Sequence, residues 1–186
     1  MGCGADAQSV DTDSLTAVRP YALVLMSIAI GTRNMELHLA DIGDIDTEKW
    51  VFYIKHVKGQ DTYGEPRTVP VPPEVRHVLL QYLILCNKWL KANSKESKAL
   101  FFGFSNDCKH LSSNSFRKIK SIAEVKIGEK FELRDCCRGF GQNYADKGLN
   151  IEAVSVLMGH STTKTTEGYY CRKSQADAME QAKRVW

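Results

Sequence analysis

The segment Phe131–Arg172 constrains this chain more than any other stretch, because glycines divide it into short helices. One predicted helix begins near Arg134 and stops at Gly148, where a left-handed residue typically ends a helix. The next predicted helix stops at Gly159. The histidine that follows is therefore expected at a turn, rather than on an apolar helix face.

Three side chains of this segment, Arg134, His160 and Tyr169, suit chemistry on a phosphodiester. An arginine can bind two non-bridging phosphate oxygens, a histidine can donate a further hydrogen bond, and a tyrosine oxygen can act as the nucleophile. Tyr170 is the competing nucleophile. Because neighbouring helical side chains point about 100° apart, only one of the two tyrosines can enter a site.

The segment resembles the end of the catalytic domain of the tyrosine recombinases, the phage-integrase type of site-specific DNA recombinase. The matching stretches are Leu133-Arg134, Met158-Gly159-His160-Ser161 and Thr165-Thr166-Glu167-Gly168-Tyr169. They correspond to the family's L-R, L-G-H-S and T-T-x-x-Y motifs. The family's spacing after the histidine selects Tyr169 over Tyr170.

An earlier stretch, Gly31–Leu37, resembles the family's G-x-R-x-x-E-L box. The resemblance implies that Arg33 is the first phosphate clamp. Glu36 lies three residues later, on the same face of a helix, and is expected to orient its catalytic neighbours. The competing interpretation is a surface Arg/Glu ion pair without a catalytic role.

Two stretches rich in β-branched and aromatic residues, Lys49–His56 and Arg67–Val71, predict an antiparallel hairpin. Lys58 follows the first strand and resembles the family's hairpin lysine, which precedes an R-x-V-P motif. Such a lysine can protonate a departing oxygen. Lys55 is the competing candidate, and a solvated turn lysine is the competing interpretation.

A chain of 186 residues is long enough for one domain with a sizeable core. Several amphipathic helices and one hairpin predict a mainly α fold with a small antiparallel β-sheet (α+β), which is the fold that the resemblance to a tyrosine recombinase catalytic domain implies. We expect a flexible segment over residues 1–12, the catalytic domain over 13–173 and a C-terminal helix over 174–186. The resemblance implies that this last helix can be exchanged between protomers.

Net charge is only +3, but basic residues gather between Lys109 and Arg138. Arg117, Lys118 and Lys120 could face DNA phosphates, although a solvated helix face explains them equally well. The six cysteines form no C-x-x-C pair, so neither a zinc site nor a disulfide scaffold is expected. The longest apolar run, Tyr21–Ile30, is too short to span a bilayer, and a cytoplasmic protein without a membrane partner is expected.

The resemblance implies a reaction without metal, ATP or another cofactor. Tyr169 would attack the scissile phosphate of double-stranded DNA to form a 3′-phosphotyrosyl link, while Arg33, Arg134 and His160 bind the phosphate and Lys58 protonates the released 5′-hydroxyl. Strand exchange would require a homo-oligomer on DNA, typically a tetramer. Recombination, integration and a mobile genetic element are the expected context.

The sequence departs from the family at Phe131, which stands where a histidine is usual. Phenylalanine can neither accept a proton nor bind phosphate by hydrogen bonds. We also expect the chain to lack the N-terminal core-binding domain of full-length recombinases, as a catalytic-domain fragment or a minimal protein would. Two alternatives therefore accompany the recombinase interpretation: a type IB topoisomerase-like relaxing enzyme, which shares the site chemistry, and a catalytically inactive DNA-binding module.

Overall fold

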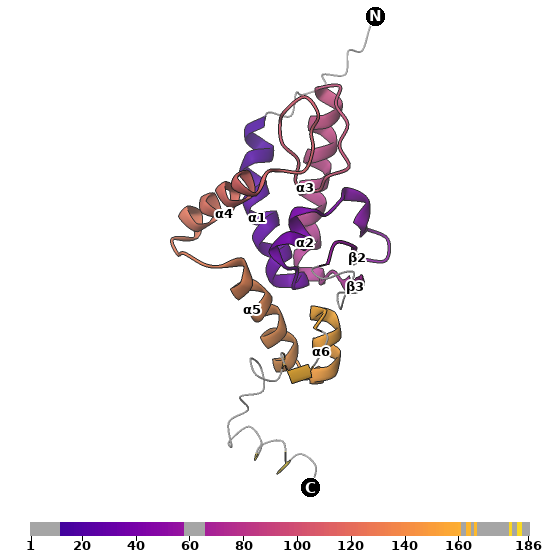
Figure 1. The fold of residues 1–186 in the computed structure, drawn as a ribbon, viewed down its shortest axis with the longest axis vertical. Coiled ribbons are helices and arrows are strands. Elements are labelled where there is room, and N and C mark those ends of the chain that lie inside the picture. The colour runs from indigo at the N-terminus through magenta and orange to yellow at the C-terminus, as the bar shows by residue number, and fades with distance from the viewer. Residues whose placement is uncertain are drawn as a thin grey trace, which may run out of the picture.

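The computed structural model describes residues 12–57, 66–160, 163–164, 166, 179 and 182–183. The helices are α1 (Thr12–Ile30), α2 (Asn34–His38), α3 (Pro73–Ala92), α4 (Ser113–Ile127), α5 (Leu133–Asp146) and α6 (Ile151–Met158). A 3-10 turn (Ile42–Asp44) leads into an antiparallel sheet of β1 (Ile45–Asp46), β2 (Val51–Ile54) and β3 (Arg67–Pro70), in the order β1-β2-β3. The expected mainly α fold with a small antiparallel sheet is confirmed (Figure 1).

Helix α1 lies at the centre of the core and packs against α3, α4 and α5. By length and composition alone it could cross a membrane, since its mean hydropathy is 1.3 over an 18-residue window. Half of that window is buried inside the protein. Leu23, Met26 and Ile30 are buried on its inner side, so the demands of a central core helix account for the composition.

Gly31 ends α1 in the left-handed region, at φ +67°. A Cβ atom at this position would lie 2.6 Å from Cδ1 of Phe140 on α5, closer than packed atoms approach. The glycine therefore serves two purposes, because it permits the turn and it lets α5 pack directly against the backbone there. The box that follows Gly31 starts at this contact between α1 and α5.

The sheet is shorter than the sequence predicts. Lys49 and Trp50 were expected in the first strand, but they lie in a turn that the carboxylate of Asp46 stabilises. That carboxylate accepts hydrogen bonds from the backbone N–H groups of Glu48 and Lys49, at 3.0 and 2.8 Å. Strand β2 therefore begins only at Val51. It pairs with β3 in antiparallel register as expected.

Local sequence accounts for several helix starts. Pro73 opens α3, Ser112 caps α4 and Asn150 caps α6. Leu100, Phe101 and Phe102 form a buried segment. In Figure 1, α5 leads from the end of α4 toward α6, and α6 packs against both α5 and β3. The end of α6 thereby approaches the start of α2 and the sheet.

Candidate functional site

The site is built around the buried carboxylate of Glu36 in α2. Arg33 is the residue that caps this helix, and its backbone N–H donates to Glu36 Oε2 over 2.8 Å. Its guanidinium Nη1 donates to Glu36 Oε1 over 2.9 Å. The expected spacing of three residues therefore produces a real ion pair, and the carboxylate fixes both the backbone and the side chain of Arg33.

Arg67 at the start of β3 binds the same carboxylate in a bidentate pair. Its Nη1 and Nη2 donate to the two oxygens of Glu36 at 2.9 and 2.8 Å. The Arg67 side chain is 8% exposed and that of Glu36 is 1% exposed. Arg67 Nε also donates to the carbonyl of Leu157 in α6 over 2.8 Å, so this arginine joins the sheet, α2 and α6.

Arg67 is a site residue that sequence reasoning missed. The signal was present, because the residue begins the stretch that resembles R-x-V-P. A strand-initial arginine is ordinarily solvated, and nothing local predicts a partner 31 residues away. Only the packing of β3 beside α2 makes the pair possible.

The two arginines decide the ionisation of Glu36. Burial would raise the pKa of this carboxyl, but the hydrogen bonds and charge of Arg67, together with Arg33, outweigh burial and lower the pKa. Glu36 is therefore an anion at neutral pH. Its charge compensates two guanidinium groups placed side by side.

The end of α6 delivers His160 to this cluster. Arg33 Nη2 donates to the carbonyl of Gly159 over 2.7 Å. Gly159 has φ +64°, and a Cβ atom there would lie 2.8 Å from Nη1 of Arg67. The turn thus requires glycine for its conformation and for the close approach of a guanidinium. His160 follows as expected, at a turn.

The His160 ring is half-buried and forms a hydrogen bond with Thr166, with 2.8 Å between Nδ1 and Oγ1. Thr166 is fully buried. Burial and the charges of Arg33 and Arg67 lower the pKa of His160, although Glu36 opposes them. The ring is accordingly neutral at pH 7. When Nδ1 accepts the Thr166 hydroxyl proton, Nε2 carries the ring proton and can donate it.

A buried thiol supports the box from α5. Cys137 Sγ donates to the carbonyl of Thr32 over 2.9 Å, directly before Arg33 in the chain. Burial, followed by the nearby Glu36 carboxylate, raises the pKa of Cys137 to about 11. The group is therefore a neutral thiol that positions the backbone.

Arg134 lies on a different, open side of the site. It is exposed near the start of α5 and lines a pocket of about 510 Å³ together with Asn34, Arg117, Lys120 and Glu132. Asn34 immediately follows Arg33, so the structure brings Arg134 toward the start of α2. Phe131, the residue at the usual histidine position, instead packs its half-buried ring against the core.

The three predicted DNA contacts on α4 differ in their surroundings. Arg117 and Lys118 are exposed. Lys120 is largely covered and forms ion pairs with Glu124 and Glu132, at 3.1 and 3.3 Å. The first two are therefore available to a ligand as they stand, whereas Lys120 must exchange a carboxylate partner.

Lys55, the competing candidate for the hairpin lysine, is paired with a carboxylate. Its ammonium pairs with the buried carboxylate of Asp44, and hydrogen bonding to that carboxylate raises the pKa of Lys55. Lys58, the lysine that the resemblance favours, lies outside the described residues, as do Tyr169 and Tyr170.

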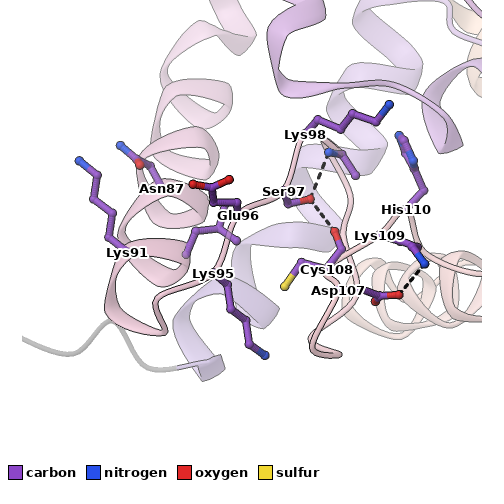
Figure 2. A pocket seen from close by; sticks show the side chains of 12 residues that line it. Asn87, Lys91, Lys95, Glu96, Ser97, Lys98, Asp107, Cys108, Lys109 and His110 are labelled. Carbon is purple, nitrogen blue, oxygen red and sulfur yellow. Dashed lines mark hydrogen bonds and ion pairs between the residues drawn. The ribbon is translucent and has the colours of Figure 1, made fainter.

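A larger hollow of about 730 Å³ lies elsewhere, between the end of α3 and the loop before α4. Figure 2 shows that it is lined by lysines, among them Lys91, Lys95 and Lys98. None of the predicted site residues lines it. Within the described part of the chain, no group of three or more His, Cys, Asp or Glu side chains could hold a metal ion.

Known proteins resemble this chain over nearly its whole length. The Phage integrase family matches residues 7–176. Tyrosine recombinase XerC of Pelotomaculum thermopropionicum is 28% identical over 167 residues, covering 87% of this chain and 52% of that protein. Tyrosine recombinase XerA of Pyrococcus furiosus is 26% identical over 168 residues, covering 89% and 55%. The chain thus spans about half the length of these curated relatives.

Solved structures share the fold. A crystal structure of XerA recombinase superimposes with a TM-score of 0.70 at 20% identity, covering 99% of this chain and 64% of that one. The Tn1549 transposon integrase in complex with transposon right end DNA gives a TM-score of 0.65 at 17% identity, covering 93% and 63%. The expected catalytic-domain fold is therefore confirmed over the part that the chain and these proteins share.

Proposed function

Because the chain belongs to the phage integrase family, we propose that it is the catalytic domain of a site-specific DNA recombinase or integrase. The observation that carries the proposal is the fixed placement of Arg33 beside His160. Glu36 orients the arginine, and the carbonyl of Gly159 accepts a hydrogen bond from it at the turn that precedes the histidine. The guanidinium of Arg33 and the imidazole of His160 can thus donate hydrogen bonds to the same phosphate.

In the proposed reaction the Tyr169 oxygen attacks the scissile phosphorus. A bond forms between phosphorus and the tyrosine oxygen, and the bond from phosphorus to the 5′-oxygen breaks. The phenolic proton passes to solvent and Lys58 supplies a proton to the departing 5′-oxygen. Arg33, Arg134 and neutral His160 donate hydrogen bonds to the non-bridging oxygens, where charge develops.

The energy of the original phosphodiester is kept in the 3′-phosphotyrosyl link. A 5′-hydroxyl from a partner duplex can therefore reverse the step without ATP, and the residues themselves supply the charge that a metal ion would otherwise provide. We propose that double-stranded DNA is the substrate, that a homo-oligomer, a tetramer, forms on it, and that the protein acts in the cytoplasm. Residues 174–186 would join neighbouring protomers.

Related proteins favour recombination over simple relaxation of supercoils. XerH site-specific recombinase has been solved bound to palindromic difH substrate in a post-cleavage complex. A relative from Enterococcus faecalis is the transposase from transposon Tn916. Phe131 favours one competing function, an inactive DNA-binding module, because it removes a polar group from the usual motif.

A nicked suicide substrate tests the proposal. Wild-type protein, Tyr169→Phe and Tyr170→Phe are incubated with it, and covalent protein–DNA adducts are resolved on a denaturing gel. We expect an adduct from wild type and Tyr170→Phe only. Loss of the adduct in Tyr170→Phe alone would reassign the nucleophile, and DNA binding without any adduct would establish the inactive module.

A further inference from the structure

Phe131 cannot supply the hydrogen bond to phosphate that a histidine at this position could supply. Its ring packs against the core, and its backbone N–H donates to Glu124 Oε1 over 3.1 Å. Phe131 is also absent from the described residues that line the pocket beside Arg134. The residue at the usual histidine position therefore cannot reach a ligand there.

A lysine from the neighbouring helix α4, Lys120, lies close to Phe131. The ammonium of Lys120 lies 5.6 Å from the centre of the Phe131 ring. Its side chain is 17% exposed, and Lys120 lines the same pocket as Arg134. Helix α4 thus brings a cation over the apolar ring and beside the arginine that α5 presents.

We propose that Lys120 is a phosphate-binding residue of this site, where it supplies the hydrogen-bond donor that Phe131 cannot supply. The inference rests on the proposed function and deepens it by naming a fourth donor. The Lys120 ammonium exchanges a hydrogen bond to a carboxylate for one to phosphate, so no covalent bond is made or broken at Lys120.

The two carboxylates explain how the exchange can occur. Glu124 accepts from Lys120 and also from the Phe131 backbone, so it is fixed by two partners. Glu132 is 71% exposed and lies farther away, at 3.3 Å. Because the Glu132 carboxylate is mostly solvated, a phosphate oxygen can displace it from Lys120 at little cost.

Lys120 can donate but cannot act as the base. Burial would lower the pKa of Lys120, but the hydrogen bonds to Glu124 and Glu132 outweigh burial and raise it. The group remains an ammonium throughout the physiological range. The lysine therefore binds charge and does not accept the tyrosine proton.

The first test measures phosphate contact without requiring cleavage. The affinity of a fluorescent duplex of arbitrary sequence is determined by anisotropy over a range of salt concentrations. Lys120→Ala is expected to lower the slope of log K against log salt by about one, as for one lost phosphate contact. An unchanged slope overturns the proposal.

Lys126→Ala provides the matched control on the same helix. Its ammonium donates to the carbonyl of Ala17 over 3.2 Å and lies 4.7 Å from the Tyr21 ring centre, so it packs against α1. We expect its salt slope to equal that of wild type. An equal fall in both variants would assign the change to general charge loss and overturn the proposal.

The second test asks whether Lys120 replaces the missing histidine. Single-turnover adduct formation is measured on the suicide substrate for Lys120→Ala in the wild-type and Phe131→His backgrounds. We expect about a tenfold to hundredfold loss in the wild-type background, as for a lost charge-assisted hydrogen bond, and less than about threefold in the Phe131→His background. Lys120→Arg should retain most of the rate.

Equal losses in the two backgrounds would overturn the replacement role. Thermal unfolding of each variant shows whether a lost rate reflects lost folding. If wild type forms no adduct while Lys120→Ala still lowers the salt slope, the proposed recombinase activity fails and the phosphate contact of Lys120 stands.

Discussion

Two of the three arginines of the candidate site, Arg33 and Arg134, have opposite environments. Arg33 lies in a closed network in which Glu36 Oε1 and Oε2 accept four hydrogen bonds from Arg33 and Arg67. Arg134 lies exposed at an open basic pocket. Folding alone therefore fixes the first half of the site, whereas the second half is left for the ligand to organise.

This contrast separates stability from catalysis. A buried network must satisfy every charge because an unpaired one is costly, so its residues are expected to control folding. An exposed arginine costs nothing to leave solvated, so its loss is expected to affect the reaction alone. Each of the following substitutions can contradict or refine this distinction between residues that control folding and residues that affect only the reaction.

Arg67→Ala should produce the largest effect, because it removes the bidentate partner of a buried carboxylate. We expect the free energy of unfolding to fall by about 3–5 kcal/mol. Urea denaturation followed by circular dichroism measures the change. Lys109→Ala, which removes an exposed pair with Asp107, is the control and should cost less than about 1 kcal/mol. A small effect of Arg67→Ala would show that the network is not structural.

Arg134→Ala should show the opposite behaviour. The exposed side chain contributes little to folding, so stability should remain within about 0.5 kcal/mol of wild type. Adduct formation on a suicide substrate should fall by about 10²–10³-fold, as for one lost donor to developing charge. If the variant unfolds early, the open half of the site also has a structural role and the contrast is wrong.

Gly159→Ala should have an intermediate effect. The left-handed backbone costs about 1–2 kcal/mol, and the new Cβ also meets Arg67, so we expect about 2–3 kcal/mol of destabilisation in urea unfolding. Gly148→Ala is the matched control, because Gly148 also has a positive φ but has no atom within 4 Å of an added Cβ. Equal costs at the two positions would show that the Arg67 contact adds nothing.

Changes of pH should have the smallest effect and should act in two steps. The pKa of His160 is lowered from 6.5, so its contribution to stability is complete above pH 6.5 and is lost as pH falls through its folded pKa. The pKa of Glu36 is lowered from 4.5, so its contribution disappears below pH 4.5. Urea midpoints from pH 8 to 3 measure both steps.

His160→Gln isolates the first of these steps. The variant should lose the dependence that begins below pH 6.5 and keep the dependence that begins below pH 4.5. A profile that matches wild type would assign the first step to another group.

The sequence predicted those parts of the fold that depend on local chemistry. The caps at Ser112 and Asn150 and the glycines at 148 and 159 carry their signal within a few residues, and α5 and α6 end close to the expected positions. The Arg33–Glu36 pair was also accessible, because a glutamate three residues after the residue that caps a helix commonly binds back to that residue.

Pairs between residues far apart in the sequence could not be predicted in this way. Arg67 meets Glu36 only through the placement of β3 beside α2, and Lys120 meets Glu132 only through the turn between α4 and α5. The strand error at Lys49 has a local cause that propensity does not include, because the Asp46 carboxylate competes for the backbone N–H groups there.

The contact between Gly31 and Phe140 bears on how sequences of this kind can diverge. Every side chain larger than hydrogen at position 31 meets the ring at 2.6 Å and requires a positive φ as well. A viable path to a larger residue there must first shrink Phe140, and an intermediate with that cavity is itself destabilised. Each of the two positions therefore restricts the residues that the other can accept.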